Sequence, residues 1–453
     1  MTDFGLLTLV PTIVVVGLAL WTRRVLESLL AGSVVGLFIV APQAPLQFLA
    51  DKSLVVMMDE TVAWVILVCG LMGSLIGLLI RTGAVHAFTD LVIGRIKSRT
   101  GALLTAWVLG IFLFVDDYLN SIAVGAAMRR VTDTFKISRE MLAYVVDSTA
   151  APVSVIIPIS TWAVFFGSLL IDNGIAPEGE GIRTYMSAIP YMFYPWLAVL
   201  IVPLVISGVV PVFGPLRSAE ARAAGGETVP PEAAHIEKAN RSIEEKRNVK
   251  GSAIQFVAPI VLLAASTWYF DLDFLKGIYM TLGLYVLLIL AQRTLPMADI
   301  VDTMIDGFKT MIEPLAVVVL AYLLKEVNDA LGLPLYTISA LAPHMTAELL
   351  PVSIFIVMAA LSFATGSSWG VFVIVLPIVT SLASSLGADM VLVIGATLSA
   401  STFGSHACFY TDATVLTAQA TSCTPYQHAI TQIPYALLAA GGAALLYLGS
   451  AFI

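Results

Sequence analysis

Residues 101–128 read GALLTAWVLGIFLFVDDYLNSIAVGAAM, an apolar run with two adjacent carboxylates, Asp116 and Asp117, at its centre. Basic residues flank the run on both sides: Arg95, Lys97 and Arg99 before it, and Arg129, Arg130, Lys136 and Arg139 after it. A single straight span would place these two groups on opposite sides of a membrane, whereas Lys and Arg favour the cytoplasmic side. The stretch 101–128 is therefore predicted to be a re-entrant hairpin with its polar tip at mid-membrane.

The composition of the whole chain supports a membrane setting. Of 453 residues, 58% are hydrophobic and 12% charged, and the mean hydropathy is +0.93. Soluble domains carry about 25% charged residues, so a soluble globule and a disordered chain are excluded. The net charge of −8 has the wrong sign for a nucleic-acid binder. The three cysteines contain no CxxC pair, which excludes a disulfide scaffold and a cysteine metal site.

The fold class predicted is an all-α polytopic membrane protein. A helix crosses the bilayer in about 20 apolar residues, and the first spans are placed near 4–21, 25–41 and 62–80. No cleavage site follows the first span, so it is expected to be retained. The segment 83–97 is expected to be amphipathic and to lie at the membrane interface.

The second half of this first unit contains a broken helix. The segment 140–171 is expected to cross outward, interrupted at residues 148–152. An acidic loop, 172–183, suits the outside, and 186–213 returns. The hydrophilic stretch 214–252 carries seven Lys or Arg and is predicted to be a cytoplasmic linker.

The chain aligns with itself at an offset of 249 residues. Spans 4–21 and 25–41 fall on 253–270 and 274–290, and Gly83 falls on Gly332. The hairpin 101–128 falls on a second polar break, in a hairpin at about 348–386. The broken helix 140–171 falls on 389–420, expected to be interrupted by polar residues: Ser399, Ser401, Thr402, Gly404, Ser405 and His406. Two transmembrane repeats, 1–213 and 253–453, are predicted.

The charges then predict how the two repeats are oriented. No Lys or Arg follows Lys325, which is expected if the second hairpin opens to the outside. The repeats would then be inverted, with both termini outside the cell and the protein in the inner (plasma) membrane. Inverted repeats with broken helices that meet at the midplane are typical of secondary transporters.

Polar residues at the first two breaks are the candidate ion ligands. They are Asp116, Asp117, Asn120, Asp147, Ser148 and Thr149. Carboxylates within the membrane mark an ion or substrate path, and hard cations such as Na⁺ take oxygen ligands. Asp117 and Asp147 are the predicted Na⁺-binding pair. The alternative for Asp116, and less so for Asp117, is a helix cap.

Polar residues of the second repeat are the candidate substrate site. They are Thr365, Gly366, Ser367, Ser368, Trp369, Ser405, His406, Tyr410 and Asp412. The alternative for the small residues is helix packing, and for His406 a structural hydrogen bond. His428 is interpreted as structural, near the cytoplasmic end. The group Lys325, Glu326 and Asp329 is interpreted as solvated or self-paired.

At these motifs the sequence resembles the NhaC family of Na⁺/H⁺ antiporters, within the ion-transporter superfamily. The resemblance is carried by DDYLNSIAVGAAMRRVTD (116–133), AYVVDSTAAPVSVIIPISTW (143–162), ATGSSWG (364–370) and TQIPYAL (431–437). It implies inverted hairpin-plus-broken-helix units, frequent dimers, and Na⁺/H⁺ exchange or ion-coupled exchange of organic solutes. One departure stands out: the family typically has G-D-H where this chain has Gly404, Ser405 and His406. The missing carboxylate calls a second cation site into question.

The sequence leaves three candidate functions. The first is Na⁺/H⁺ antiport by alternating access, with no cofactor beyond the transported ions, the lipid bilayer as surroundings and a homodimer as the expected assembly. The second is transport of a small organic solute, an amino acid or a carboxylate, coupled to Na⁺ or H⁺ on the same fold. The third is an intramembrane enzyme, disfavoured because the zinc-protease motif His-Glu-x-x-His is absent.

Overall fold

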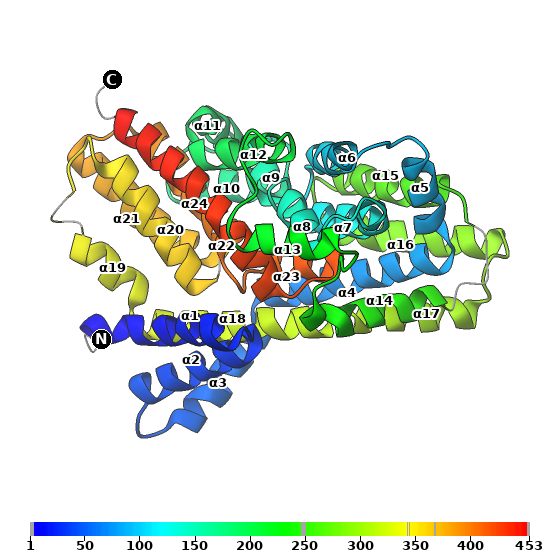
Figure 1. The fold of residues 1–453 in the computed structure, drawn as a ribbon. Helices are drawn as coiled ribbons and strands as arrows, with labels where there is room; N and C mark the ends of the chain where they lie inside the picture. Colours follow the sequence, from blue (N-terminus) through cyan, green and yellow to red (C-terminus); the bar gives the residue numbers. More distant parts are fainter. Residues whose placement is uncertain (1–3, 246–250, 342, 344, 367, 451–453) are drawn as a thin grey trace.

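The computed structural model describes residues 4–245, 251–341, 343, 345–366 and 368–450, and these contain helices and no strand (Figure 1). The helices up to residue 206 are α1 (Val10–Thr22), α2 (Val25–Val40), α3 (Pro45–Met58), α4 (Glu60–Arg81), α5 (Ala84–Ile93), α6 (Arg99–Phe112), α7 (Asp117–Thr134), α8 (Arg139–Asp147), α9 (Ala151–Ile156), α10 (Thr161–Asp172), α11 (Gly181–Ala188) and α12 (Phe193–Ile206). Short 3₁₀ helices lie at Gly5–Leu9, Ile189–Tyr191 and Pro231–Ala233.

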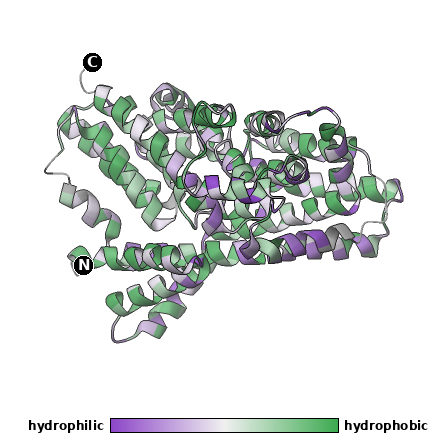
Figure 2. Ribbon diagram, in the orientation of Figure 1, coloured by the Kyte–Doolittle hydropathy of each residue, from purple (hydrophilic) through white to green (hydrophobic). Residues whose placement is uncertain are grey.

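The helices after residue 213 are α13 (Gly214–Ala224), α14 (Ala234–Glu245), α15 (Ile254–Tyr269), α16 (Phe274–Ala291), α17 (Met297–Lys309), α18 (Ile312–Leu331), α19 (Leu333–Leu341), α20 (Leu350–Thr365), α21 (Ser368–Leu386), α22 (Met390–Ala407), α23 (Asp412–Thr421) and α24 (Pro425–Ser450). In the described part of the chain, five helical stretches are long and apolar enough to cross a membrane, or up to nine if each bent pair counts as one span. In Figure 2 the ribbon of most of these helices is coloured as hydrophobic. The polytopic all-helical class is therefore confirmed.

The predicted first hairpin appears as α6 and α7, which pack against each other. The chain leaves the helical conformation at Leu113, and Asp116 begins α7 by accepting hydrogen bonds from the backbone N–H groups of Tyr118 and Leu119 at 3.0 and 3.1 Å. A carboxylate in that position satisfies donors that a helix start leaves unpaired. The two carboxylates thus break the apolar run because one of them caps the second helix.

The first broken helix is interrupted where the sequence indicated. Residues 148–150 separate α8 from α9, and Pro152 lies in the first turn of α9, where its missing N–H costs no hydrogen bond. A second interruption follows, and α10 is bent by 41° from the preceding pair.

The second broken helix is interrupted later than predicted. α22 continues through Ser399, Thr402 and His406 to Ala407, and the break lies at residues 408–411. The Thr402 hydroxyl donates to the carbonyl of Leu398 one turn earlier, at 2.9 Å. A helix accommodates hydroxyl residues when they bond to their own backbone in this way, so polarity alone did not locate the break.

The stretch 214–252 is more ordered than a bare linker. It contains α13 and α14. In Figure 2 most of α14 is coloured as hydrophilic. Arg222 of α13 binds Glu140 of α8 through two hydrogen bonds, at 3.0 and 2.7 Å. Glu220 accepts from the N–H and hydroxyl of Ser138 and pairs with Arg99. The linker is thus docked on the start of the first broken helix.

The order of helices follows the 249-residue offset. α4 and α18 each end at a glycine in the left-handed conformation, Gly83 (φ 76°) and Gly332 (φ 77°), and each is followed at once by a short helix. α10 falls on α23, and α3, which the sequence analysis did not place, falls on α17. The inverted orientation of the two repeats stays a prediction.

Helices α4 and α17 approach each other at a pair of glycines. A Cβ atom on Gly307 would lie 2.3 Å from the Gly73 carbonyl oxygen, and one on Gly73 would lie 2.6 Å from the Gly307 carbonyl oxygen. Backbone atoms cannot move out of the way as a flexible side chain can. The close packing of α4 on α17 therefore depends on the absence of side chains at both positions.

We expect Gly307→Ala to lower the thermal unfolding midpoint of the purified protein, because overpacking of this kind costs about 1–3 kcal/mol. Gly283→Ala in α16 is the matched control, since a Cβ there meets no atom within 4 Å. An equal response of the two variants would contradict the close packing of α4 on α17.

A pH-dependent contribution to stability is expected from Glu237 of α14. Burial raises the pKa of Glu237, but the positive charges of Arg139 and Arg129 outweigh burial and hold it below its ordinary value. A group with a lowered pKa in the folded state stabilises that state above its unfolded pKa, about 4.3. This contribution is lost as the pH falls through the folded-state value.

The thermal midpoint of Glu237→Gln should therefore lie below that of the wild type at pH 7, and the difference should shrink as the pH is lowered below about 4.3. Glu178→Gln, at an exposed position in the loop before α11, serves as the control and should show no such pH-dependent difference. A gap that stays constant from pH 7 to pH 3 would refute the electrostatic role of Glu237.

Candidate functional site

Three helix interruptions meet in the interior of the protein. They are the turn between α6 and α7, the break between α8 and α9, and the break between α22 and α23. α7 packs against α8 and α23, and α24 packs against α8, α22 and α23. Because a helix break frees backbone carbonyls and N–H groups, the polar side chains gathered here have hydrogen-bonding partners that an unbroken helix does not offer.

Asn120 joins the first two interruptions. Its Nδ2 donates to the carbonyl of Gly110 near the end of α6 and to the carbonyl of Thr149 in the α8–α9 break, each at 2.6 Å. Its Oδ1 is buried and accepts no hydrogen bond from the described residues. The Thr149 hydroxyl donates to its own helix, to the carbonyls of Val145 and Val146. Asn120 thus holds two breaks together and still presents one free acceptor.

The neighbouring carboxylates Asp116 and Asp117 differ in their environment. Asp116 caps α7, and its second oxygen accepts from the Thr161 hydroxyl at 3.1 Å. Asp117 is buried, and the Trp162 side chain of α10 is near enough to interact with its carboxylate, but no described residue donates to Asp117 Oδ1 with full hydrogen-bond geometry. The capping alternative therefore applies to Asp116, and Asp117 is the carboxylate with an open ligand position.

Asp412 brings a third carboxylate to this place. It lies at the start of α23 and accepts a short hydrogen bond from the Tyr118 hydroxyl. Asp412 is close enough to interact electrostatically with Asp117 on one side and with Asp147 on the other. We call Asp116, Asp117 and Asp412 the carboxylate cluster. The ring of Trp64 from α4 packs 5.5 Å from the ring of Tyr118.

Asp147 lies at the end of α8 in a network of donors. Its Oδ2 accepts from Gln432 Nε2 at 2.7 Å and lies 3.0 Å from His428 Nε2, and its Oδ1 accepts from the Thr417 hydroxyl at 3.5 Å. All four residues are buried. Asp117 and Asp147, which were predicted to bind Na⁺ as a pair, are not joined by a hydrogen bond in the described structure. Asp412 interacts electrostatically with both of them.

A second histidine extends this network. Ser148 Oγ lies 2.9 Å from His406 Nε2, and the Tyr194 hydroxyl of α12 lies 2.7 Å from His406 Nδ1. The carbonyl of His406 also accepts from Gln432. Asp147, Ser148, His406, Tyr194, Gln432 and His428 form what we call the histidine network.

The second hairpin tip is contacted by Tyr410. The Tyr410 hydroxyl donates to the carbonyls of Phe363 and Ala364 at 3.2 and 2.8 Å, and its ring fills the space beside Gly366, which adopts a positive φ of 66°. Thr365 donates to the carbonyl of Leu361 at 2.9 Å. Tyr410 therefore packs against the end of α20 and bonds two of its last carbonyls, which is a structural role.

Three of the predicted substrate residues are described in part or not at all. Ser367 lies outside the described residues, and Ser368 and Trp369 are described only as backbone at the start of α21. Ser405 contributes its carbonyl, which accepts from the hydroxyls of Thr411 and Thr414 and thereby ties α22 to α23.

Several participants were missed by sequence reasoning. His428 was placed near the cytoplasmic end, yet it contacts Asp147; Gln432, Thr417 and Tyr194 were not considered. Gln432 lies within the TQIPYAL segment that carries the family resemblance, so a signal existed for it. Its contacts, like those of Tyr194, depend on packing between helices far apart in sequence.

The self-paired interpretation of the charged group on α18 is confirmed. Lys325 lies 3.0 Å from Asp329 and 3.5 Å from Glu326, and Glu326 also binds Lys52 of α3 at 2.8 Å. These four residues join α3 to α18.

The site is rich in oxygen ligands and donors. The described residues contain no group of three or more His, Cys, Asp or Glu arranged to hold a metal ion tightly. They offer one open carboxylate oxygen, Asp117 Oδ1, two open amide oxygens, Asn120 Oδ1 and Gln432 Oε1, and the carbonyls of interrupted helices. Such ligands suit a hard monovalent cation.

Comparison with known proteins gives the family. A model described as the Na⁺/H⁺ antiporter family matches residues 170–452. A protein of Haemophilus influenzae, itself uncharacterized, is 29% identical to the chain over 480 aligned positions, which cover 97% of this chain and 90% of that protein. The family model spans the second half of the chain with α10 to α24, including Asp412, His406 and His428. The chain therefore belongs to the Na⁺/H⁺ antiporter family, of the NhaC type.

Proposed function

We propose that the protein exchanges Na⁺ for H⁺ across the inner membrane by alternating access. The observation that carries the proposal is the carboxylate cluster: the buried Asp116 and Asp117 and the partly buried Asp412 lie at helix interruptions, with no Lys or Arg bound to them in the described structure. Charges of one sign in a low-dielectric interior repel strongly. Such a cluster favours either a bound cation or bound protons.

The proposed Na⁺ ligands are Asp117 and Asn120. Their open oxygens come from residues three apart on α7, which share one face of a helix. The C-terminal end of α6 lies beside them, because Asn120 is bonded to the Gly110 carbonyl. Helix C-termini carry partial negative charge, which favours a cation. Ser148 and Thr149 are supporting candidates from the adjacent break.

Asp147 is the second exchanging carboxylate in this proposal. Its carboxylate oxygens contact the side chains of Gln432, Thr417 and His428. Asp412 couples it to Asp117 electrostatically. Arrival of Na⁺ at Asp117 would lower the cost of ionising the neighbouring carboxylates, so that protons leave as the cation binds. Competition of this kind exchanges the two ions.

The orientation and assembly proposed follow from the sequence. The docked linker helices, α13 and α14, face the cytoplasm because seven Lys or Arg lie within 214–252. Termini on a common outer side are proposed from the same charge pattern; in Figure 1 the start of α1 and the end of α24 both lie at the left of the view. A homodimer is proposed from the family resemblance.

Proteoliposomes with an internal pH dye and an imposed pH gradient test the exchange. Adding Na⁺ or Li⁺, but not K⁺, should collapse the gradient. No response to any of the three cations would refute Na⁺/H⁺ exchange and favour the second function, an ion-coupled organic solute transporter, to be screened with amino acids and carboxylates.

Asp117→Asn and Asp147→Asn should each reduce Na⁺-dependent proton flux by at least about 100-fold, because each removes a charge that the ion exchange requires. Asp389→Asn is the matched control: Asp389 caps α22 at an exposed position, and Asn caps equally well. Monodisperse elution of all three variants shows that they fold. Undiminished flux in both Asp117→Asn and Asp147→Asn would remove these residues from the mechanism.

Sodium should also stabilise the purified protein in a pH-dependent way. At an ion concentration 100 times the dissociation constant, binding contributes about 2.7 kcal/mol. The thermal midpoint should rise with NaCl, relative to KCl, at high pH, and the rise should diminish at low pH because protons occupy the carboxylates. Asp117→Asn should abolish the difference between the two salts; a sodium effect that grows with acidity would contradict competition.

A further inference from the structure

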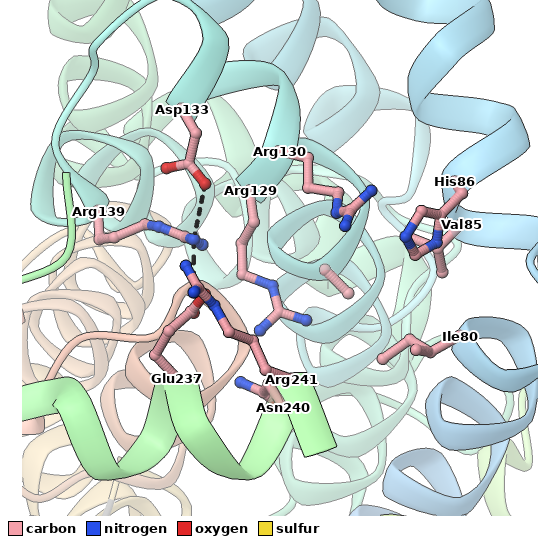
Figure 3. A pocket seen from close by; sticks show the side chains of 11 residues that line it. Ile80, Val85, His86, Arg129, Arg130, Asp133, Arg139, Glu237, Asn240 and Arg241 are labelled. Carbon is pink, nitrogen blue, oxygen red and sulfur yellow. Dashed lines mark hydrogen bonds and ion pairs between the residues drawn. The ribbon is translucent and has the colours of Figure 1, made fainter. Parts of the chain in front are cut away.

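Two cavities adjoin the docked linker helices. The arginine-lined cavity, of about 600 Å³, lies between α14 and helices α4, α5, α7 and α8. Figure 3 shows Arg139 bound to Asp133 in its wall, and Arg139 lies at the opposite end of α8 from Asp147. The second cavity, of about 640 Å³, lies between α13 and the start of α24. We call it the linker cavity. It borders α24, whose side chains contact Asp147.

The linker cavity is accessible from outside the protein and large enough for a hydrated ion. Ser218 of α13 and Glu232 are exposed residues of its lining. Two charged groups of the lining offset each other, because Arg222 binds Glu140 at 2.7 Å. The volume of the cavity far exceeds that of one water molecule, about 30 Å³. A cation can therefore enter it together with its water shell.

The first turns of α24 separate the linker cavity from Asp147. Gln427 and Thr431 are part of the cavity wall. The residue after each of them, His428 and Gln432, has its side chain in contact with Asp147, at 3.0 and 2.7 Å. Both of these side chains belong to residues with 0% exposure. A single α-helix, about 10–12 Å across with its side chains, thus divides the cavity from the ion site.

Pro434 weakens α24 just beyond this segment. Proline has no N–H, so Pro434 donates no hydrogen bond to the carbonyl of Ile430, which lies four residues earlier and lines the cavity. A proline inside a helix is a common site of bending. At the other end, between α23 and α24, Ser422 adopts the left-handed conformation with φ of 58°. Residues 425–433 therefore form a short helical segment between two points where the helix is interrupted or weakened.

The linker contacts this segment from the side of the cavity. Glu232 accepts a hydrogen bond from Gln427 Nε2 at 2.5 Å. Gly214, at the start of α13, lies beside the hinge, since a Cβ atom on Gly214 would be 3.4 Å from the ring of Pro434. α13 itself is docked on the start of α8. The linker thus connects the segment and its proline to α8.

We propose that residues 425–433 of α24 form a gate between the linker cavity and the ion site, with a hinge at Pro434. The proposal rests on the proposed function and adds the route by which a hydrated monovalent cation reaches Asp147 from the linker side. When the segment swings about Pro434, His428 and Gln432 leave Asp147, and the cavity opens onto the carboxylate. When the segment returns, their contacts with Asp147 close the path, which is the arrangement in this structure.

Pro434→Ala tests the hinge. Alanine supplies an N–H that can bond to the Ile430 carbonyl, so the gate opens only if this additional hydrogen bond breaks. The maximal rate of Na⁺-dependent proton flux should fall about tenfold, the effect of one net hydrogen bond on a barrier. The rise of the thermal midpoint with NaCl over KCl should stay as in the wild type, because no ion ligand is changed.

Pro259→Ala is the matched control for the hinge. Pro259 also lies inside a helix, α15, which packs on α5 and α16 rather than on the linker cavity. This variant should keep the maximal rate of the wild type. A merely structural role of Pro434 would change the thermal midpoint of Pro434→Ala and leave its maximal rate unchanged.

A reversible tether tests the movement in a protein that has already folded. The native cysteines, Cys69, Cys408 and Cys423, are buried. Gln427→Cys combined with Glu232→Cys therefore places two accessible thiols on side chains that face each other. A bifunctional methanethiosulfonate that bridges them should abolish Na⁺-dependent proton flux, and a reducing agent should restore it. The same double variant treated with a monofunctional methanethiosulfonate is the control and should keep its flux.

The proposal is overturned if Pro434→Ala transports as fast as the wild type, or if the bridged protein retains its flux. Either result leaves the exchange by the wild type intact and so concerns the gate alone. If the wild type itself exchanges no Na⁺ for H⁺, the proposed function is refuted and the gate as a cation route falls with it. If Pro434→Ala does not fold, the tether still decides, because it is formed after folding.

Discussion

The structure depends on satisfying the polar groups that interrupted helices leave in an apolar interior. A buried carbonyl or N–H without a partner costs several kcal/mol in hydrocarbon. Asn120 satisfies such groups at two interruptions, because its amide nitrogen donates to a carbonyl near the end of α6 and to another in the α8–α9 break. Asp116 does the same for the start of α7. The interruptions are thus held in place by the Asn120 amide nitrogen and by Asp116, while the Asn120 Oδ1 and the neighbouring Asp117 Oδ1 stay open to an ion.

The same interior joins the two halves of the chain. Tyr118 binds Asp412, Ser148 binds His406, and Asp147 binds His428, contacts between residues 294, 258 and 281 positions apart. Each of these three contacts joins one of the two predicted repeats to the other. A change in the packing of the halves would therefore change the number of donors around Asp147 and the neighbours of Asp117 together. That dependence gives a physical basis for coupling ion binding to a conformational change.

The linker extends this coupling to the surface. α13 is fixed to the start of α8 by Arg222 and Glu220, and α14 is fixed to the same region by Glu237 and Arg139. α8 runs from these ion pairs at one end to Asp147 at the other. A rigid helix of this kind moves as a unit, so events at the linker and at the ion site act on the same element.

The sequence by itself determined the helical membrane class, the positions of the first hairpin and the first break, and the family. These follow from local properties: apolar length, a carboxylate that caps a helix, and Pro152 in a first turn are properties of neighbouring residues. The break after α22 was placed too early because hydroxyl residues that bond to their own helix do not interrupt it. The partners of Asp147 and Asp412, the structural use of Tyr410 and the arginine-lined cavity were decided only by the tertiary structure. Each of these depends on which side chains from distant helices lie within hydrogen-bonding distance in a closely packed interior, and no local pattern in the sequence specifies that.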